Sequence, residues 1–229
     1  MNQLTTNSKE GFFKYPDSTR VHRNLPKTKL YEQTNANSKL KEMFVSQVEQ
    51  IMWANKLSAQ TLNIESHTEN TEIQLFEIKL KGEQLNTEVL QAIDKAIPHP
   101  IFFEVKTFTK KQYVTACYKT IGGNGGVSLS EYYQSELSLD EESLIRIELP
   151  VALNTKGLYE QILASLLPYD LRKNESFTQL LNRLDEIKSL QRKQQQVNRK
   201  LSNEKQFKNK VTINAELKQI KQQLKQLTA

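Results

Sequence analysis

Hydrophobic residues in the segment 37–53 recur at intervals of three and four positions, which is the spacing of one face of an α-helix. Asn37 or Ser38 can cap this helix, because either side-chain oxygen accepts a hydrogen bond from a free backbone N–H of the first turn. The preceding segment Leu25–Tyr31 is predicted to be extended or looped, since Pro26 disfavours helical geometry at the residue before it. The hydrophobic positions of the predicted helix are Leu40, Phe44, Val48, Ile51 and Met52.

Alternation of hydrophobic and polar residues predicts β-strands in the middle of the chain. The clearest case is Glu72–Leu80, where the hydrophobic side chains from Phe76 to Leu80 alternate with charged ones. Further strands are predicted at Ile101–Thr107, Gln112–Thr120, Glu131–Leu137 and Leu144–Leu149, the first two joined as a hairpin at Lys110 and Lys111.

Helical spacing returns at Thr87–Ile97, where Pro98 ends the helix, and in a helix that Asn154 or Thr155 caps and Pro168 ends. Together these elements predict an α+β domain over residues 25–168, with one mostly antiparallel sheet of about five strands and flanking helices. Residues 1–24 are expected to form a loose N-terminal arm. The predicted core consists of Leu40, Phe44, Val48, Ile51, Phe76, Ile78, Ile101, Phe103, Leu158 and Ile162.

Beyond Pro168 the pattern is helical throughout, and no Gly or Pro follows up to residue 229. Two four-three repeats are present, and the stretch Asn203–Thr212 between them carries no hydrophobic seam. An antiparallel helical hairpin that breaks near Asn203–Asn209 explains this pattern, and one continuous coiled-coil helix of roughly 80 Å is the alternative. The first repeat contains Leu180, Leu184, Ile187 and Leu201 with polar interruptions at Gln191, Gln194 and Asn198, and the second contains Ile213, Leu217, Ile220, Leu224 and Leu227.

Charge separates this C-terminal segment from the rest of the chain. Residues 171–229 contain 14 Lys and Arg against 5 Asp and Glu, a net charge of +9, whereas the other 170 residues contain 18 and 21, a net charge of -3. A basic helical arm on a nearly neutral body is expected to contact a nucleic-acid backbone or an acidic protein surface, and a solvated lysine-rich helix is the alternative. The residues predicted to contact nucleic acid, independently of its sequence, are Arg183, Lys188, Arg192, Lys193, Arg199, Lys200, Lys205, Lys208 and Lys210.

The polar interruptions of the helical seam argue against a strong homodimeric coiled coil, so we expect an external protein partner. The residues predicted to contact this partner are Leu217, Ile220, Leu224 and Leu227.

Composition excludes several classes of protein. Cys117 is the single cysteine, which excludes an internal disulfide and a zinc site built from cysteines. Because the chain has only three histidines as further nitrogen ligands, we expect no metal and no cofactor. No run approaches the roughly 20 apolar residues of a membrane-spanning helix, and residues 1–14 lack the apolar core of a signal peptide. We therefore expect a soluble, cytoplasmic protein.

Two Glu-x-Lys triplets, Glu77–Lys79 and Glu104–Lys106, fall on predicted strands. Residues two positions apart in a strand share a face, so each triplet brings a carboxylate and an ammonium group together. In restriction-type nucleases the carboxylate of such a triplet binds Mg²⁺ with an Asp from a neighbouring strand, and the Lys orients the attacking water. Neither triplet has an Asp on a preceding strand, and a surface of cross-strand salt bridges explains both, so no catalytic residue is assigned.

In combination, six segments between Leu25 and Leu227 resemble the bacterial family DUF4391, a domain of unknown function. The resemblance implies a genomic context: members are often encoded beside Swi/Snf-like helicases and DNA methyltransferases, in islands that look like restriction or phage-defence systems. The family has no established catalytic residues, so none is transferred. The segments are LPKTKLYE (Leu25–Glu32), KLKEMFVSQVEQIMWANKLSAQTLNI (Lys39–Ile64), AIDKAIPHPIFFEV (Ala92–Val105), YYQSE (Tyr132–Glu136), GLYEQILASLLP (Gly157–Pro168) and EKQFKNKVTINAELKQIKQQL (Glu204–Leu224).

The preferred hypothesis is a non-catalytic accessory subunit of a bacterial restriction or phage-defence-type complex. It would dock to a helicase or DNA methyltransferase subunit through its α+β body and its basic coiled-coil arm. A metal-dependent nuclease of the restriction-endonuclease type, which uses one of the two triplets, is the second hypothesis. The third is an antitoxin-like regulator, which would bind its own promoter specifically.

Overall fold

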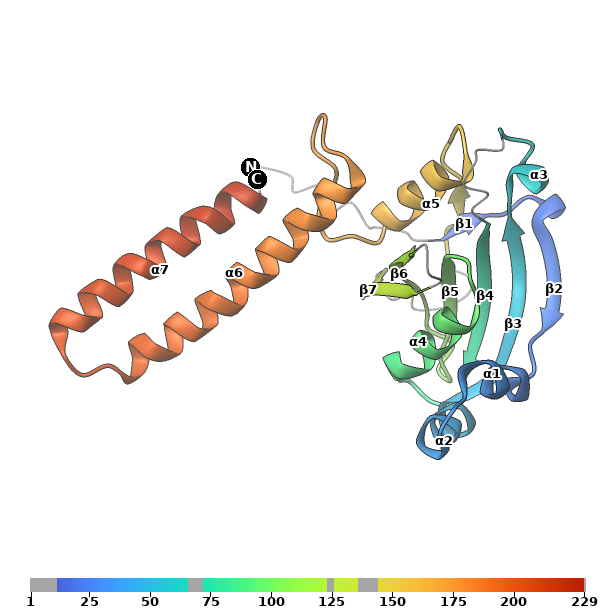
Figure 1. The fold of residues 1–229 in the computed structure, drawn as a ribbon, viewed down its shortest axis with the longest axis horizontal. Helices are drawn as coiled ribbons and strands as arrows, with labels where there is room; N and C mark the ends of the chain where they lie inside the picture. Colours follow the sequence, from blue (N-terminus) through green and yellow to red (C-terminus); the bar gives the residue numbers. More distant parts are fainter. Residues whose placement is uncertain (1–11, 66–71, 123–125, 136–143, 229) are drawn as a thin grey trace. The chain divides into compact units, whose positions relative to one another are not determined.

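A six-stranded sheet organises the first of two units into which the chain divides, residues 1–167 and 168–229. The computed structural model describes residues 12–65, 72–122, 126–135 and 144–228 (Figure 1). All neighbouring strands are antiparallel except β4 and β5, which confirms the predicted α+β fold with a mostly antiparallel sheet. In spatial order the strands are β2 (Arg20–Asn24), β3 (Val48–Leu57), β4 (Ile73–Leu80), β5 (Ile101–Lys106), β6 (Gln112–Ile121) and β7 (Val127–Gln134).

Helices flank the sheet, and one of them makes the parallel pairing possible. Parallel neighbours cannot be joined by a tight turn, so the chain crosses over from β4 to β5 through α4, which Asn86 caps. A separate two-stranded parallel sheet pairs β1 with β8. The remaining elements of this unit are β1 (Phe13–Lys14), the 3₁₀ helix η1 (Asp17–Thr19), α1 (Lys27–Thr34), α2 (Ser38–Gln47), α3 (Ala59–Leu62), α4 (Thr87–Ala96), β8 (Ile147–Glu148) and α5 (Thr155–Ala164).

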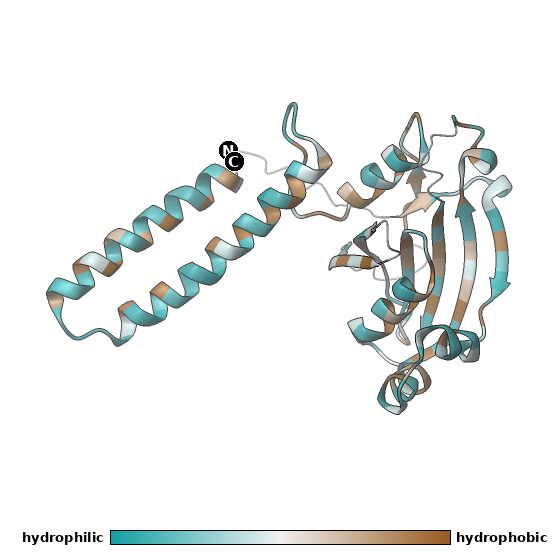
Figure 2. Ribbon diagram, viewed as in Figure 1, coloured by the Kyte–Doolittle hydropathy of each residue, from teal (hydrophilic) through white to brown (hydrophobic). Residues whose placement is uncertain are grey.

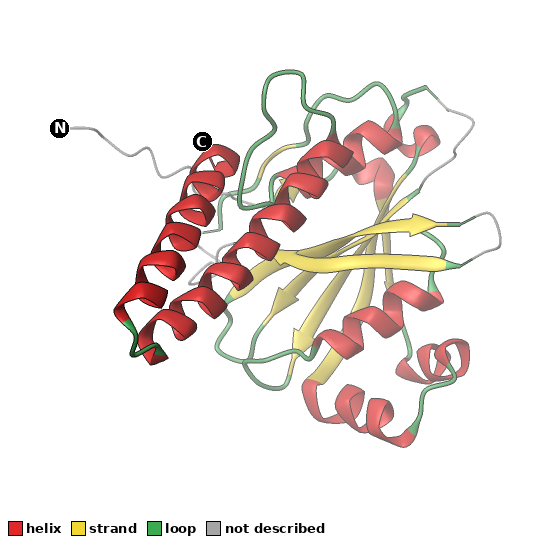
Figure 3. Ribbon diagram, turned by 60° about the vertical axis from the view of Figure 1, so that its left-hand side comes forward, coloured by secondary structure: helices red, strands yellow, loops and turns green. Residues whose placement is uncertain are grey.

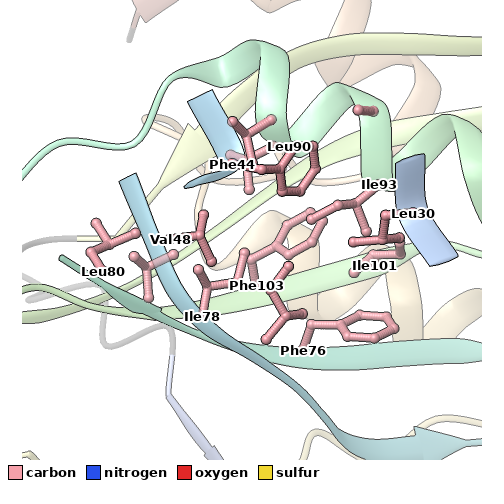
Figure 4. Close-up of a cluster of buried hydrophobic side chains, with 14 of the residues drawn as sticks. Leu30, Phe44, Val48, Phe76, Ile78, Leu80, Leu90, Ile93, Ile101 and Phe103 are labelled. Carbon is pink, nitrogen blue, oxygen red and sulfur yellow. The ribbon is translucent and has the colours of Figure 1, made fainter. Parts of the chain in front are cut away.

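The predicted core is divided between the two faces of the sheet. On one face, side chains from α1, α2 and α4 pack on β3, β4 and β5, as Figure 4 shows for Phe44, Ile93 and Phe103. Leu158 and Ile162 are buried as well, but they belong to α5, whose Tyr159 packs edge-on against Phe102 on the opposite face. The prediction that Leu158 and Ile162 join the rest of the core in one cluster is therefore wrong. Phe102 and Phe103 are neighbours in β5, so their side chains point to opposite faces of the sheet and belong to different clusters.

The segment predicted as one helix, residues 37–53, is divided between α2 and β3, so the prediction is wrong in its second half. The register of β3 against β4 shifts twice, which marks two bulges or irregularities in the strand. These shifts place its buried residues three positions apart, so that an irregular strand imitates the spacing of a helix. The buried positions are Val48, Ile51, Ala54 and Leu57.

Two predictions about the N-terminal segment are also wrong. Residues 20–24 form the edge strand β2 instead of a loose arm, and their side chains are mostly exposed, so no hydrophobic alternation marks them. The segment predicted as extended contains α1, which begins directly after Pro26. Proline restricts the backbone of the residue before it, here Leu25, and is compatible with the start of a helix.

The predicted strand Leu144–Leu149 exists only as β8, and it pairs with β1 instead of extending the main sheet. Its hydrophobic side chains, Ile145 and Ile147, face solvent, whereas Arg146 is turned toward the sheet. The predicted alternation is present, but its hydrophobic face is the exposed one. The predicted strand Glu131–Leu137 corresponds to β7 up to Gln134, and its end lies outside the described residues.

The second unit is a pair of antiparallel helices, α6 (Phe177–Asn203) and α7 (Phe207–Thr228), which lie side by side (Figures 1 and 3). Ser176 caps α6 in a reciprocal arrangement: its hydroxyl accepts from the Gln179 N–H, and the Gln179 side chain accepts from the Ser176 N–H. The chain turns at residues 204–206, which confirms the hairpin and excludes one continuous helix.

The seam between α6 and α7 is more apolar than the sequence repeat suggested. Val197, Leu217 and Ile220 are buried in it, and Leu190 and Leu201 pack beside them. Of the predicted polar interruptions, Gln191 and Asn198 are exposed, because the seam of α6 runs through the residue before each of them, whereas Gln194 is half-buried. Figure 2 shows the two helices as largely hydrophilic (teal), with short hydrophobic interruptions (brown).

Among the helices that the structure describes, none combines the length and the apolar character needed to cross a membrane.

Phe44 tests the core between α2 and the sheet. It is fully buried and stacks edge-on against Tyr31 at 5.5 Å, so Phe44→Ala leaves a cavity and should lower the free energy of unfolding by about 3–5 kcal/mol. Urea denaturation followed by circular dichroism measures this loss. The neighbouring exposed position supplies the control, since Val45→Ala should change stability by no more than about 0.5 kcal/mol. Equal effects of the two changes would contradict the proposed core.

Candidate functional site

The two Glu-x-Lys triplets lie side by side on one face of the sheet. The parallel register of β4 and β5 sets Glu77 opposite Glu104 and Lys79 opposite Lys106. A cavity of about 330 Å³ opens over the two carboxylates. Polar side chains from β2, β3 and the adjoining loops complete its wall, among them Tyr15, Arg20, His22, Asn55 and Arg146.

Arg146 neutralises Glu104 at the base of this cavity. Its Nη1 lies 2.9 Å from Oε1 and its Nη2 lies 2.6 Å from Oε2, which is the bidentate geometry preferred between guanidinium and carboxylate. The same Nη1 donates to the carbonyl oxygen of Phe13, and Tyr15 shares a hydrogen bond with Glu104. Burial, reinforced by the negative charge of Glu104, raises the pKa of Tyr15 well above its usual value, so the phenol is a neutral donor.

Glu77 completes the pair of carboxylates. Partial removal from water, and secondarily the charge of Glu104, raise its pKa. A divalent metal ion at this place would have to displace Arg146, since both oxygens of Glu104 are already bound. Across the described ranges no group of three or more His, Cys, Asp or Glu side chains is arranged to hold a metal ion. The residues present therefore fit a guanidinium better than a metal.

The lysine of the first triplet makes a surface salt bridge. Lys79 lies 2.7 Å from Glu49 of β3, and both side chains are about half exposed. Such a pair contributes little to stability, but it agrees with the reading of this face as a set of cross-strand charges.

A second group of polar residues is buried between α4 and the strands β6 and β7. Asp94 is fully buried and accepts a hydrogen bond of 2.5 Å from the Tyr132 hydroxyl. Lys119 lies 3.7 Å from the other Asp94 oxygen and donates to the carbonyl oxygens of Asp94, Ile97 and His99. Because these carbonyls lie at and beyond the C-terminal end of α4, the ammonium group of Lys119 caps the helix.

The titration of this buried group follows from its surroundings. Burial raises the pKa of Asp94 to about 6, although Tyr132, Lys119 and Cys117 act in the opposite direction. Burial, with the nearby Asp94 charge, also raises the pKa of the Cys117 thiol above its usual range. A thiol held in the protonated form is a poor nucleophile, so Cys117 acts here as a packing residue.

Arg183, which the sequence assigned to nucleic-acid contact, is occupied inside the hairpin. Its side chain is buried, with Nε 2.7 Å from Glu175 Oε1 and Nη2 2.8 Å from Glu175 Oε2. The same guanidinium donates to the carbonyl oxygens of Asp170 and Leu227. Arg183 therefore joins the start of α6 to the end of α7, and the Arg183 interaction lowers the pKa of Glu175 to about 2.

The other predicted nucleic-acid residues lie on the outside of the hairpin, with Lys188 and Lys210 half-buried. Lys193 forms a partly exposed ion pair with Glu216 at 3.3 Å, which ties one cation to the neighbouring helix. The hairpin thus presents a row of cations to solvent. Its exposed members are Arg192, Lys193, Arg199, Lys200, Lys205 and Lys208.

The residues predicted to contact a protein partner lie in the seam of the hairpin. Leu217 and Ile220 are buried against α6, and Leu224 packs beside them half-buried. Leu227 is half-buried as well, near the end of α7. A charged residue at Leu217 would therefore disrupt the packing of α7 on α6 before it affected an external partner.

Sequence reasoning did not find Arg146, Tyr15 or the Asp94–Lys119 pair. Arg146 lies in a predicted strand between two hydrophobic residues, so the alternation assigns it to the solvent-exposed face. Its partner Glu104 is 42 residues away in the chain. Asp94 sits within an otherwise hydrophobic helical face, and this single polar residue on the buried side of α4 was the available signal.

The fold and these surfaces define a two-part protein: an α+β body with a polar cleft, and a basic two-helix arm. The chain belongs to the family described as Domain of unknown function (DUF4391), which matches residues 13–224. This match confirms the family resemblance seen in the sequence. No curated protein and no solved structure matches the chain.

Asp94 gives the body a pH dependence that can be measured. Because burial raises the pKa of Asp94 to about 6, the folded state holds the proton more tightly than the unfolded chain, whose Asp titrates near 4. The free energy of unfolding should therefore fall as the pH rises through this window, by about 1–3 kcal/mol relative to Asp94→Asn, which cannot ionise.

Urea denaturation of both proteins at several pH values between about 4 and 7 measures the difference. Asp185→Asn, at an exposed position on α6, serves as the control and should follow the wild-type curve. A wild-type stability that rises relative to Asp94→Asn over the same range would contradict the argument.

Proposed function

We propose that this protein is a non-catalytic accessory subunit of a bacterial restriction or phage-defence-type complex that contains a helicase or DNA methyltransferase. In this proposal the basic arm binds a nucleic-acid backbone, and the α+β body docks the protein partner. The observation that carries the proposal is the row of exposed cations along a hairpin whose hydrophobic seam is already used for its own packing.

The arm has the charge and the dimensions of a backbone-binding element. Arg192 to Lys200 cover eight helical steps, or about 12 Å, within which a DNA duplex carries several phosphates at one charge per roughly 1.7 Å of axis. A helix with this density of cations repels itself unless an anion lies alongside, although salt screens part of the cost. Nucleic acid supplies such an anion along the whole row.

Because the hydrophobic seam is packed within the hairpin, a nucleic acid is favoured over another helix as the partner of the arm. The sequence favoured another helix paired with Leu217 and Ile220, but these side chains are buried against Val197 of α6. What remains accessible on the arm is mainly polar and cationic. Its surface therefore supports contact with nucleic acid more directly than contact with a second coiled coil.

The body carries a surface suited to a protein. Between β8 and α5, Val151 is 94% exposed and Leu153 is 83% exposed, and Ile145 and Ile147 face solvent just before them. The Val151 carbonyl is bonded to the Gln161 side chain, so this segment is tied to α5. Four exposed aliphatic residues lie within nine positions of the chain, and exposed apolar surface gathered in one place often marks protein contacts. We call residues 145–153 the aliphatic segment.

Charge reversal on the arm tests the nucleic-acid half of the proposal. Wild-type protein should bind duplex DNA of unrelated sequences equally well, with an affinity that falls steeply with salt, since each neutralised phosphate contributes roughly -0.9 to the log–log slope. Replacing Arg192, Lys193, Arg199 and Lys200 together by Glu should remove this binding. Fluorescence anisotropy at increasing salt measures both effects.

A matched control and three contrary outcomes complete this test. Reversal of Lys39 and Lys41, which lie on α2 of the body, should leave binding intact. No DNA or RNA binding by the wild type at about 50 mM salt would remove nucleic acid from the proposal. Binding restricted to one promoter would support the antitoxin-like regulator, and Mg²⁺-dependent cleavage would support a nuclease.

A metal-dependent nuclease is the second candidate function, and one observation favours it. The parallel register brings both Glu-x-Lys triplets together beneath a cavity, which the sequence alone did not require. Against this candidate stands the Arg146 guanidinium, which occupies both oxygens of Glu104. Cleavage of DNA in Mg²⁺ that is lost in Glu77→Gln but kept in Glu88→Gln, an exposed acid of α4, would decide in its favour.

The aliphatic segment generates a prediction about the protein partner. When the protein is co-expressed with a helicase or DNA methyltransferase from its own genomic neighbourhood, as the proposal requires, that partner should co-purify. Val151→Asp combined with Leu153→Asp should abolish co-purification, because two charges replace apolar contacts while no buried residue is changed. Val45→Asp, at another exposed aliphatic position, should have no effect. Undiminished co-purification of the double variant would refute this docking surface.

A further inference from the structure

The turn of the hairpin is held in one conformation by Glu204. Its Oε1 accepts the backbone N–H groups of Lys205 and Gln206, each at 2.8 Å, and its Oε2 accepts from the Asn209 side chain at 3.1 Å. Its own N–H bonds to the carbonyl oxygen of Lys200, which closes the last turn of α6. The residues that follow Glu204 are therefore displayed from a fixed turn.

This turn displays an aromatic side chain to solvent. Phe207, the first residue of α7, is 81% exposed, and Val211 one helical turn later is 54% exposed. Residues four apart share a helix face, so the ring and the aliphatic side chain form one apolar strip. Neither residue contributes to the seam, which begins at Ile213. The internal packing of the hairpin gives no reason for a phenylalanine at this position.

Cations surround the apolar strip. Lys205 and Lys208 lie on either side of Phe207 in the chain and are exposed, Lys210 follows half-buried, and Arg199 and Lys200 lie near the C-terminal end of α6. The acid of the turn, Glu204, already accepts the hydrogen bonds described above, and these bonds lower its pKa. The tip of the hairpin, residues 199–211, thus combines an exposed ring with an excess of positive charge.

Resting on the proposed function of the arm, we propose that this tip is a binding platform for single-stranded nucleic acid, on which an unpaired base stacks on Phe207. In a duplex the base faces are covered by their neighbours, so an exposed ring finds a stacking partner only where a strand is unpaired. The lysines at either side of the ring then neutralise the phosphates that flank the stacked base. The row of cations farther along α6 serves duplex and single strand alike.

The charge of the tip favours this occupant over an apolar protein pocket. A protein partner that buries the Phe207 ring must also remove the five cations of the tip from water. The free-energy cost of that desolvation exceeds the gain from burying the ring, unless the partner supplies matching anions. A nucleic-acid strand supplies an anion at every residue and an aromatic face beside it. Both features of the tip are then used at once.

Equilibrium binding to labelled oligo(dT) of about 20 nucleotides and to a duplex of the same length tests the inference. Phe207→Ala should weaken binding to oligo(dT) at least about fivefold, the lower end of what one stacked base contributes, and should leave duplex binding within about twofold of the wild type. Phe207→Trp should retain oligo(dT) binding, with a tryptophan emission that the strand quenches. Circular dichroism checks that each variant keeps its helices.

Phe108→Ala is the matched control, because Phe108 is 73% exposed in the turn between β5 and β6 of the body. It should change neither affinity. Equal loss of oligo(dT) and duplex binding in Phe207→Ala would overturn the inference, and so would oligo(dT) binding that is unaffected. In both cases the proposed function stands as long as charge reversal on α6 still removes duplex binding. Loss of partner co-purification in Phe207→Ala, with both affinities unchanged, would overturn it in favour of a protein-binding tip.

Discussion

The parallel pairing of β4 with β5 is the constraint on which the arrangement of the body depends. It requires the crossover through α4, and the end of that helix is fixed by the ammonium group of Lys119. On the opposite face the same pairing brings Glu77 next to Glu104, and two adjacent carboxylates repel each other. Arg146 relieves this repulsion and, through the Phe13 carbonyl, ties the small β1–β8 sheet to the large one.

The arm has a small hydrophobic core, and two charged side chains, one at each end, hold its two helices together. Arg183 binds Glu175 and the last carbonyls of α7 at one end, and Glu204 organises the turn at the other. A buried pair such as Arg183–Glu175 adds little net stability, because desolvation offsets much of the attraction. Its role here is to fix the register of the two helices, and with it the positions of their cations.

Strongly shifted pKa values often mark active sites, yet here their causes are structural. Asp94, Cys117 and Tyr132 are removed from water together and bind one another. The carboxylates of the cleft are more accessible, but Arg146 and Tyr15 already engage Glu104. Among the described residues, the aliphatic segment of the body and Phe207 at the tip of the arm expose hydrophobic side chains to solvent, and it is on these surfaces that the proposals above rest.

The sequence by itself determined the α+β class, the two helical repeats with a gap between them near Asn203–Asn209, and the excess of positive charge on the arm. These follow from local periodicity and composition, which tertiary contacts do not alter. Only the tertiary structure decided that Val48–Leu57 is a strand, since its irregular pairing with β4 gives it a helix-like spacing. Likewise, the meeting of Arg146 with Glu104, and the burial of Leu217 against Val197, depend on which segments become neighbours in space. Contacts between residues tens of positions apart leave no periodic trace in the chain. For this reason the cleft, and the residues of α6 that cover the repeat of α7, could not be predicted from it.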